Sequence, residues 1–492
     1  MGNDTVRTSY GALRGAEDRG VTAFLGIPFA RPPVGDLRLR PPEPPAPWEG
    51  VRTAGTIAAW APQQLPVGPS RIGGEEVGTS EDCLYLNVWT PGPDPAARRP
   101  VMVWIHGGGF MSGSGGGALY NGARLAAAGD VVVVTINYRL GVLGFAAHPD
   151  LRDEASGAAG NWGLLDQVAA LRWVRNEIAA FGGDPGNVTI FGESAGSMSV
   201  ATLLGVPAAA GLFHKAIAES GGPNASPMET AASVTETVTE ALGLSSVAGL
   251  READIDAVVG AQTGVLAGRR AVMLPFVPVV DGGVIVEDSQ TAIAGGASAD
   301  VPMVIGTNRE EMRFFAIGDR SAFGMDEERL ARRLARTIDD PGPVTDAYRA
   351  ARAGRGETAS PFELWSAIES DRVFRVPAMR AAEAHARHQP STFAYLFTYP
   401  SPVFDGALGA CHALEVPFVF DNLDLPLIAP FTGTGPDVAT LSRIMQDSWI
   451  AFAHTGDPGW PPYEAGRRAT MILDRDSHVE GAPMEEERRF WG

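Results

Sequence analysis

One serine in this chain has a glycine two residues before it and another two residues after it. It is Ser194, in the stretch FGGDPGNVTIFGESAG (residues 181–196). The β-branched residues 188–190 predict a strand before the serine, and the residues after it resume a helical pattern. Gly192 and Gly196 leave out Cβ atoms where such a turn packs tightly, so the serine can take an unfavourable backbone conformation with its hydroxyl exposed. This pattern is typical of a nucleophilic serine; the alternative is an ordinary loop rich in glycine and serine.

A second glycine-rich segment has the spacing expected of an oxyanion hole. The sequence HGGGF (106–110) directly follows VMVWI (101–105), an apolar run that predicts a buried strand. Glycines allow backbone N–H groups to point at a developing negative charge without side-chain obstruction. The alternative is a flexible glycine loop, since GSGGG follows at 113–117. The position after a strand and upstream of Ser194 favours the oxyanion hole.

A nucleophilic serine needs a base, and histidine is the usual one. Eight histidines are present. His412 stands in GACHALEVPFVF, a turn-like segment after a predicted strand at 392–399. His106 directly precedes the glycine loop, and His385 and His388 lie in a charged helical region where a solvated face is expected. We therefore expect His412 to be the base.

The third member of such a triad is an acid that orients the histidine. In one known order the acid lies between the serine and the histidine along the chain, at the end of a strand. Glu310 and Glu311 follow the predicted strand VPMVIGT (301–307) and fit this position. Their spacing alone does not choose between them.

The elements around these residues alternate between strands and helices. VMVWI and VVVVTI (131–136) are continuous apolar runs, typical of central strands covered on both faces. Residues 162–181 have apolar residues at helical spacing. Alternation of this kind predicts an α/β fold with a large, mostly parallel sheet and helices on both faces. We also expect strands at 188–191, 215–220, 301–307 and 392–399, helical segments over 321–388, and a closing helix at 440–456.

Composition excludes several classes of function. The chain has 492 residues and a net charge of −19, so it lacks the basic face that a nucleic-acid binder needs. Its start has no signal-peptide pattern, and no apolar run is long enough to span a membrane. Two distant cysteines, Cys83 and Cys411, make neither a disulfide framework nor a zinc site. We expect one domain over residues 1–492 in the cytoplasm, with a helical side region at about 316–390 and no metal or cofactor.

Several long stretches resemble the type-B carboxylesterases, the cholinesterase-like branch of the α/β-hydrolases. FGGDPGNVTIFGESAG is similar to the active-serine signature of that family, and EDCLYLNVWTP (81–91) to its second signature. The similarity is greater to bacterial para-nitrobenzyl-esterase-like members than to secreted animal enzymes. Other similar stretches are GIPFARPPVGDLRLRPP, WIHGGGF, NYRLGVLGF, GNWGLLDQ, ESGGPN, GTNREE, GACHALEVPFVF and WIAFAHTGDPGWPPY.

The resemblance implies a triad of Ser194, Glu311 and His412. It selects Glu311 over Glu310, because the family acid is the second of two adjacent acidic residues. Met312 stands where many members have glycine, which puts the setting of the local turn in question.

The resemblance also implies residues around the triad. The oxyanion donors would be the N–H groups of Gly108, Gly109 and Ala195. Glu193 would tune the protonation of the histidine, and Ser220 would steady the acid.

The cysteines depart from the pattern of this family. The position that would pair with Cys83 falls near Ala61, so that disulfide is expected to be absent, which suits a reducing compartment. Cys411 is expected to be a small buried residue.

The function expected is hydrolysis of carboxylic esters of short to medium acyl chains, including aromatic esters. Alternatives are a carbamate or amide hydrolase with the same triad, an interfacial lipase, and an inactive binding module. We expect a small-molecule ester as partner and a monomer or homodimer. Four aromatic residues are candidates to line an apolar pocket, with the core as the alternative: Phe110, Phe314, Phe315 and Phe418.

Overall fold

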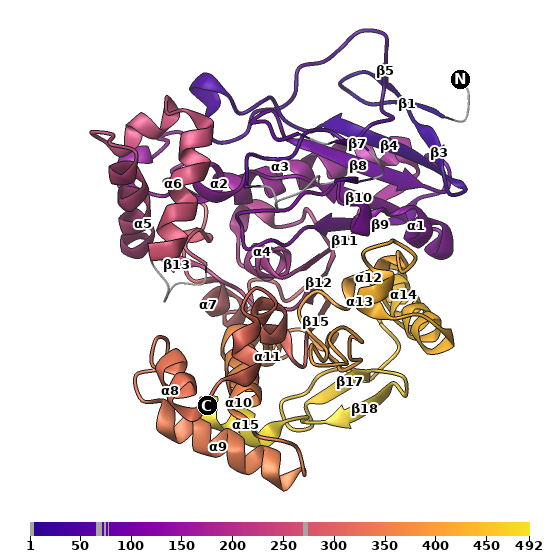
Figure 1. Cartoon of the computed structure of the whole chain (residues 1–492). Helices are drawn as coiled ribbons and strands as arrows, with labels where there is room; N and C mark the ends of the chain where they lie inside the picture. The colour runs from indigo at the N-terminus through magenta and orange to yellow at the C-terminus, as the bar shows by residue number, and fades with distance from the viewer. Residues whose placement is uncertain (1–3, 65–70, 73–74, 77, 269–273) are drawn as a thin grey trace.

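A large mixed β-sheet organises the molecule. The computed structural model describes residues 4–64, 71–72, 75–76, 78–268 and 274–492. In this part of the chain, eleven strands form one sheet in the order β18-β17-β16-β15-β12-β11-β9-β10-β8-β4-β3 (Figure 1). They are β3 (Ala16–Asp18), β4 (Val21–Pro28), β8 (Tyr85–Thr90), β9 (Arg99–Ile105), β10 (Val132–Ile136), β11 (Gly183–Glu193), β12 (Lys215–Glu219), β15 (Met303–Asn308), β16 (Thr392–Phe397), β17 (Ala469–Leu473) and β18 (His478–Gly481).

The centre of this sheet is parallel. From β17 to β10 neighbouring strands run in the same direction, for example with Val132 opposite Val101 and Ile136 opposite Ile105. Strands β8, β4 and β3 at one end, and β18 at the other, are antiparallel to their neighbours. The carboxyl ends of the parallel strands meet along one edge, so the turns that follow β9, β11 and β15 are brought together.

Two hydrophobic cores cover the two faces of the sheet. Val101, Val103 and Ile105 of β9 belong to one core, whereas Met102 and Trp104 belong to the other, as the alternation of side chains along a strand requires. Both faces of β9 are thus buried, which explains its continuous apolar sequence.

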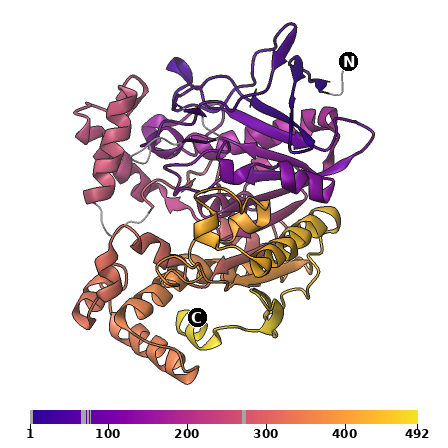
Figure 2. The ribbon, with the colours of Figure 1, turned by 45° about the vertical axis from the view of Figure 1, so that its right-hand side comes forward.

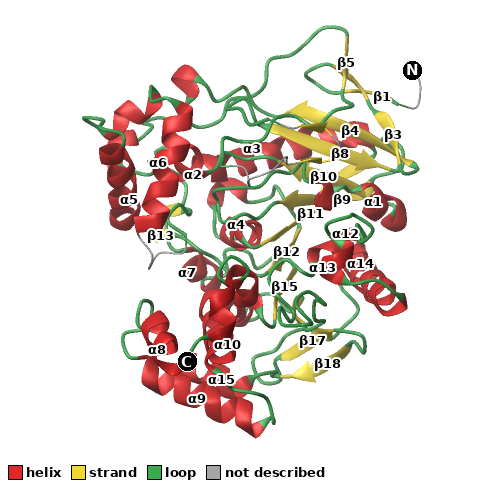
Figure 3. Ribbon diagram, viewed as in Figure 1, coloured by secondary structure: helices red, strands yellow, loops and turns green. Residues whose placement is uncertain are grey.

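Helices complete both layers, as Figure 3 shows. The first face is covered by α3 (Trp162–Glu177), α4 (Ala195–Leu203) and α11 (Val376–His385). The second face is covered by α1 (Ala123–Gly129), α12 (Val416–Phe420) and α14 (Pro436–Thr455). The predicted α/β architecture, with a mostly parallel sheet between helical layers, is confirmed.

Further helices lie at the periphery (Figure 2). Helices α5 (Met228–Ala241) and α6 (Ile255–Gly268) pack on each other at one side. A second group consists of α8 (Glu327–Leu334), α9 (Pro341–Gly354), α10 (Pro361–Ser370) and α15 (Glu485–Trp491). Smaller elements are β1 (Thr5–Arg7), β2 (Ala12–Arg14), β5 (Val51–Thr53), β6 (Arg71–Ile72), β7 (Glu75–Glu76), α2 (Gly141–Phe145), β13 (Ser226–Pro227), β14 (Val279–Val280), α7 (Ser289–Ala294) and α13 (Ala429–Thr432).

The strands expected from the sequence are all present, and the helix expected at 162–181 consists of α3 and a following 3-10 helix (Ile178–Phe181), which is capped by Gly182 with a φ of +86°. The helix at 440–456 is part of α14, but it does not close the chain, because β17, β18 and α15 follow it. Helices α8 to α10 lie in the region 316–390, whereas α11, in the same region, packs on β15 and β16. That residues 316–390 form a helical side region within a single domain stays a prediction.

Three local expectations can be compared with the structure. Cys83 and Cys411 are both buried free thiols. His385 was expected on a solvated face, but it is buried, with Nδ1 2.7 Å from the hydroxyl of Thr392. The expectation was wrong because His385 lies on the alanine-rich face of α11, which packs on the sheet. Among the described helices, none is long and apolar enough to cross a membrane.

Candidate active site

Ser194 occupies the sharp turn between β11 and α4. Its backbone has φ +57° and ψ −121°, a region that side-chain-bearing residues rarely adopt. The Ser194 N–H donates to the carbonyl of Glu219, and its carbonyl accepts from Met198 in the first turn of α4. The strand–turn–helix context expected from the sequence is therefore present, and the strained residue at its apex is the serine.

The flanking glycines are required by close backbone contacts. A Cβ at Gly192 would lie 2.5 Å from the carbonyl oxygen of Ile105, and a Cβ at Gly196 would lie 1.9 Å from the same atom. No side chain fits at either distance. The turn thus packs directly against the end of β9, where the HGGGF segment begins.

The HGGGF segment passes beside the serine. A Cβ on Gly107 would lie 3.0 Å from Cβ of Ser194, and Gly108 and Gly109 both have positive φ, +108° and +63°. Within the described residues no protein acceptor pairs with the N–H of Gly108 or Gly109. Backbone donors without a protein partner next to the serine are suited to bind an oxyanion. Burial lowers the pKa of His106 to about 4, so this histidine is neutral.

His412 contacts a carboxylate at each ring nitrogen. Its Nδ1 lies 2.6 Å from Oε2 of Glu311, and its Nε2 lies 3.0 Å from Oε1 of Glu193. The other oxygen of Glu311 accepts the N–H of Asn308 at 2.8 Å, which fixes the carboxylate. Of the two adjacent glutamates, the structure thus brings Glu311 to the histidine.

The serine and the histidine are not hydrogen-bonded to each other in the described structure, since Nε2 contacts Glu193 instead. Catalytic hydrogen bonds are often long or misaligned without substrate and shorten when it binds. Burial lowers the pKa of His412, but the nearby carboxylates of Glu193 and Glu311 outweigh this effect and raise it to about 9. Burial raises the pKa of Glu193 to about 7, against the opposing effect of His412.

Comparisons with known proteins agree with the geometry of this site. The sequence model of the carboxylesterase family matches residues 2–491. The chain belongs to the carboxylesterase family. It is 40% identical to the para-nitrobenzyl esterase of Bacillus subtilis strain 168, over 99% of this chain and 98% of the relative. It is 37% identical to the phenmedipham hydrolase of Pseudarthrobacter oxydans, over 95% of this chain and 94% of the relative.

The solved structures agree with this assignment. The Geobacillus stearothermophilus carboxylesterase EST55 at pH 6.2 matches with a TM-score of 0.87 and 40% identity, over 99% of this chain and 100% of that chain. The fold is therefore that of the α/β-hydrolases. As a member of this family, the chain is a carboxylic ester hydrolase of the serine carboxylesterase class.

Two buried glutamates of this carboxylesterase were not predicted from the sequence. Glu415 is fully buried and accepts hydrogen bonds from the Asn308 amide and, at 3.2 Å, from the Ser220 hydroxyl. Glu219, also fully buried, accepts the indole N–H of Trp449 at 2.8 Å. Both stand within apolar runs, ALEVPF and KAIAES, and a glutamate in such a run signals a buried carboxylate.

The contact of Ser220 corrects one expectation. Its hydroxyl was expected to steady the acid of the triad, but it donates to Glu415. Burial, together with the carboxylates of Glu193 and Glu311, raises the pKa of Glu415 to about 8. Ser220 and Asn308 thus hold a second carboxyl group behind the site.

Aromatic rings surround one side of His412. The ring centroids of Phe374, Phe315 and Phe314 lie 4.7, 5.1 and 6.2 Å from that of His412. Phe314 and Phe315 are partly exposed, with 37% and 44% of their surface accessible, so two of the four expected aromatic residues border the site.

The other two aromatic candidates lie in the core. Phe110 is fully buried and its ring packs edge-on against Phe145 at 4.9 Å. Phe418 is fully buried among Phe397 and Tyr399, in the hydrophobic core on the second face of the sheet. For both residues the core alternative replaces the pocket prediction.

Met312 does not disturb the acid. It is buried in the first turn of a 3-10 helix (Glu311–Ala316), and its N–H donates to the hydroxyl of Ser370 at 3.0 Å. The side chain packs into the hydrophobic core while Glu311 still reaches His412. A methionine is therefore compatible with this turn.

Proposed function

We propose that Ser194, His412 and Glu311 form the catalytic triad of this carboxylesterase. The observation that carries the proposal is the 2.6 Å contact between Glu311 and Nδ1 of His412, beside a serine held in a strained turn. A carboxylate on Nδ1 fixes the tautomer and the orientation of the ring, so that Nε2 is directed to the nucleophile.

The reaction is acyl transfer through a covalent intermediate. Nε2 of His412 takes the proton of Ser194 as Oγ attacks the ester carbonyl carbon. The carbonyl π electrons move to oxygen, and the resulting oxyanion is bound by the N–H groups of Gly108, Gly109 and Ala195. The oxyanion electrons then re-form the carbonyl, the bond between the acyl carbon and the alkoxy oxygen breaks, and the imidazolium protonates that oxygen so that the alcohol leaves. Water, activated by the same histidine, hydrolyses the acyl-enzyme and restores the serine.

The close contact between Glu193 and His412 has a role in this catalytic cycle. A carboxylate at Nε2 favours the imidazolium that forms in each half-reaction. Substrate binding shifts Nε2 from Glu193 toward the Ser194 hydroxyl, as expected for catalytic hydrogen bonds that align only in the complex. No step requires a metal or another cofactor.

The substrates proposed are neutral carboxylic esters with short to medium acyl chains or aromatic groups. The partly exposed rings of Phe314 and Phe315 next to His412 support an apolar substituent on the ester. One relative is named a para-nitrobenzyl esterase and another a phenmedipham hydrolase, and a para-nitrobenzyl group is aromatic. We also propose a cytoplasmic enzyme that acts as a monomer or homodimer.

The test is an activity profile on p-nitrophenyl esters of increasing acyl length. Wild type is compared with Ser194→Ala and with Ser156→Ala, an exposed serine that is not part of the proposed triad. We expect activity with short and medium chains, unchanged in Ser156→Ala and reduced about 10⁵-fold or more in Ser194→Ala. Activity that survives in Ser194→Ala contradicts the proposed nucleophile. Turnover of carbamates but not esters would favour the carbamate alternative.

A further inference from the structure

The turns that bear Glu311 and His412 are joined by backbone and side-chain hydrogen bonds. The N–H of Glu310 donates to the carbonyl of Ala410, and the N–H of Ala410 donates to Oε2 of Glu310, both at 2.9 Å. The amide of Asn308 donates to the carbonyl of Cys411 at 2.8 Å. Glu310 thus binds both the N–H and the carbonyl of Ala410, two residues before His412.

The carboxylate of Glu310 lies against Gly409 of the opposing turn. Gly409 has a φ of +57°, and a Cβ at this position would lie 2.8 Å from Oε2 of Glu310. The carboxylate therefore lies directly on the backbone of the turn that leads to the histidine.

We propose that Glu310 is a positioning residue for His412. This inference rests on the proposed function, in which His412 must stay aligned with both Glu311 and Ser194. Glu310 accepts the Ala410 N–H, fixes the peptide that precedes Cys411 and His412, and so keeps the imidazole within reach of Glu311. The two adjacent glutamates then have different tasks: Glu311 contacts the histidine ring, and Glu310 anchors the histidine's backbone.

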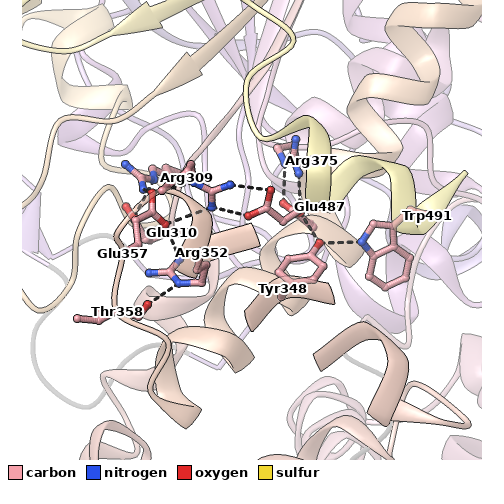
Figure 4. A network of polar contacts seen from close by, with 11 residues as sticks. Arg309, Glu310, Tyr348, Arg352, Glu357, Thr358, Arg375, Glu487 and Trp491 are labelled. Atoms are coloured by element: carbon pink, nitrogen blue, oxygen red, sulfur yellow. Dashed lines mark hydrogen bonds and ion pairs between the residues drawn. The ribbon is translucent and has the colours of Figure 1, made fainter. Parts of the chain in front are cut away.

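A chain of charges holds Glu310 from the outside, as Figure 4 shows. Nε of Arg309 lies 3.3 Å from Oε1 of Glu310, and Nη2 of the same arginine lies 2.6 Å from Glu357. Glu357 also pairs with Arg355, which reaches the fully buried Glu487 of the C-terminal helix α15.

These outer ion pairs are partly exposed, with 34% of the Arg309 side chain and 21% of the Glu357 side chain accessible. Exposed pairs of this kind contribute little. The acceptor oxygen of Glu310, rather than its charge, is therefore the feature that matters most.

The test compares two substitutions at this position in the full-length protein. Glu310→Gln keeps an oxygen that accepts the Ala410 N–H, whereas Glu310→Ala leaves that N–H without its acceptor. We expect Glu310→Ala to lower kcat on p-nitrophenyl acetate about 10- to 100-fold with KM within about twofold, since a small misplacement of a catalytic group has an effect of this size. Glu310→Gln is expected to restore kcat to within about threefold of wild type.

Glu357→Gln is the matched control, because Glu357 belongs to the same charged chain and its ion pairs are with Arg309, Arg352 and Arg355 rather than with the histidine turn. Its kcat is expected within about twofold of wild type. Thermal unfolding of each variant establishes that it is folded. If Glu310→Ala does not fold, Glu310→Asp, which shortens the reach by one methylene, is expected to lower kcat without changing KM.

Three results would overturn the proposal: a folded Glu310→Ala (or, if it does not fold, Glu310→Asp) with wild-type kcat, a loss seen in KM alone, or an equal loss in Glu310→Gln and Glu310→Ala. These outcomes are distinct from failure of the proposed function, because they are read in a background where wild type hydrolyses the ester and Ser194→Ala does not. An inactive wild type would refute the triad itself and the inference with it.

Discussion

Glu193 precedes the serine of the turn, and its carboxylate lies 3.0 Å from Nε2 of His412, on the side of the ring opposite to Glu311. The imidazole is thus held between two carboxylates in a buried site. Each negative charge favours the protonated ring, so the pKa of His412 is raised to about 9 although burial alone lowers it.

Glu193→Gln is expected to shift the pH profile. The base must be neutral to accept the serine proton, and removing one negative charge lowers the pKa of His412. The acid limb of kcat/KM therefore moves to lower pH, by about one unit. The measurement is kcat/KM on p-nitrophenyl acetate from pH 5 to 10 for both proteins. An unchanged or higher apparent pKa would show that Glu193 does not act on the histidine.

Glu311→Gln is expected to lower kcat about 10³- to 10⁴-fold with little change in KM, because the amide no longer stabilises the imidazolium or selects its tautomer. Glu43→Gln, an exposed glutamate paired with Arg31, is the control and is expected to keep wild-type activity. Steady-state kinetics at one pH suffices. A loss below tenfold in Glu311→Gln would argue against this residue as the acid of the triad.

The aromatic residues separate into two groups by their effects. Phe418→Ala is expected to lower the free energy of unfolding by about 3–5 kcal/mol, because the ring is fully buried in the core. Chemical denaturation measures this change. A change below about 1 kcal/mol would contradict the core assignment.

Phe315→Ala is expected to act on substrate binding instead. The ring is 44% exposed beside His412, so its loss raises KM for an aromatic ester about tenfold and that for an acetate ester much less. The comparison of the two KM values is the measurement. Equal effects on both esters would remove Phe315 from the substrate site.

Glu415 is expected to make stability depend on pH. Its pKa in the folded protein is raised to about 8, chiefly by burial, above the ordinary value of 4.5. The folded state therefore holds the proton of Glu415 more tightly than the unfolded state does. The stabilisation that this proton provides is present below pH 4.5 and is lost as the pH rises through 8. Glu415→Gln, which stays neutral, is expected to flatten the fall in Tm between pH 5 and 9. An equally steep fall in the variant would assign the dependence to other groups.

Much of the fold was predictable because burial leaves a local signal. Strands β9 and β10 are covered on both faces, so they appear in the sequence as unbroken apolar runs. Strand β17 is as long as β10, but it was missed because it follows a segment rich in glycine, proline and charge; β18, with the sequence HVEG, has no apolar pattern at all. In the folded protein β17 pairs with β16, and β18 pairs with β17.

The candidate site was predictable where the backbone imposes residue types. Gly192 and Gly196 are fixed by contact with Ile105, so the serine turn is visible as a motif. The role of a side chain that depends on distant partners was not visible. Phe418 and Phe315 are the same residue type, and only the packing places one in the core and the other beside the histidine. The apolar run around Glu415 signals its burial, but its hydrogen-bond partners Ser220 and Asn308 lie far away in the sequence and were not visible.

The central claim is that Ser194 carries the acyl group during turnover. The direct measurement is rapid-mixing kinetics with p-nitrophenyl acetate, followed by labelling of the same protein with a fluorophosphonate and peptide mapping by mass spectrometry. We predict a burst of p-nitrophenol that approaches one equivalent per chain, and one phosphonyl group on the peptide that contains Ser194. A burst that persists in Ser194→Ala, or a label on another residue, would contradict the account.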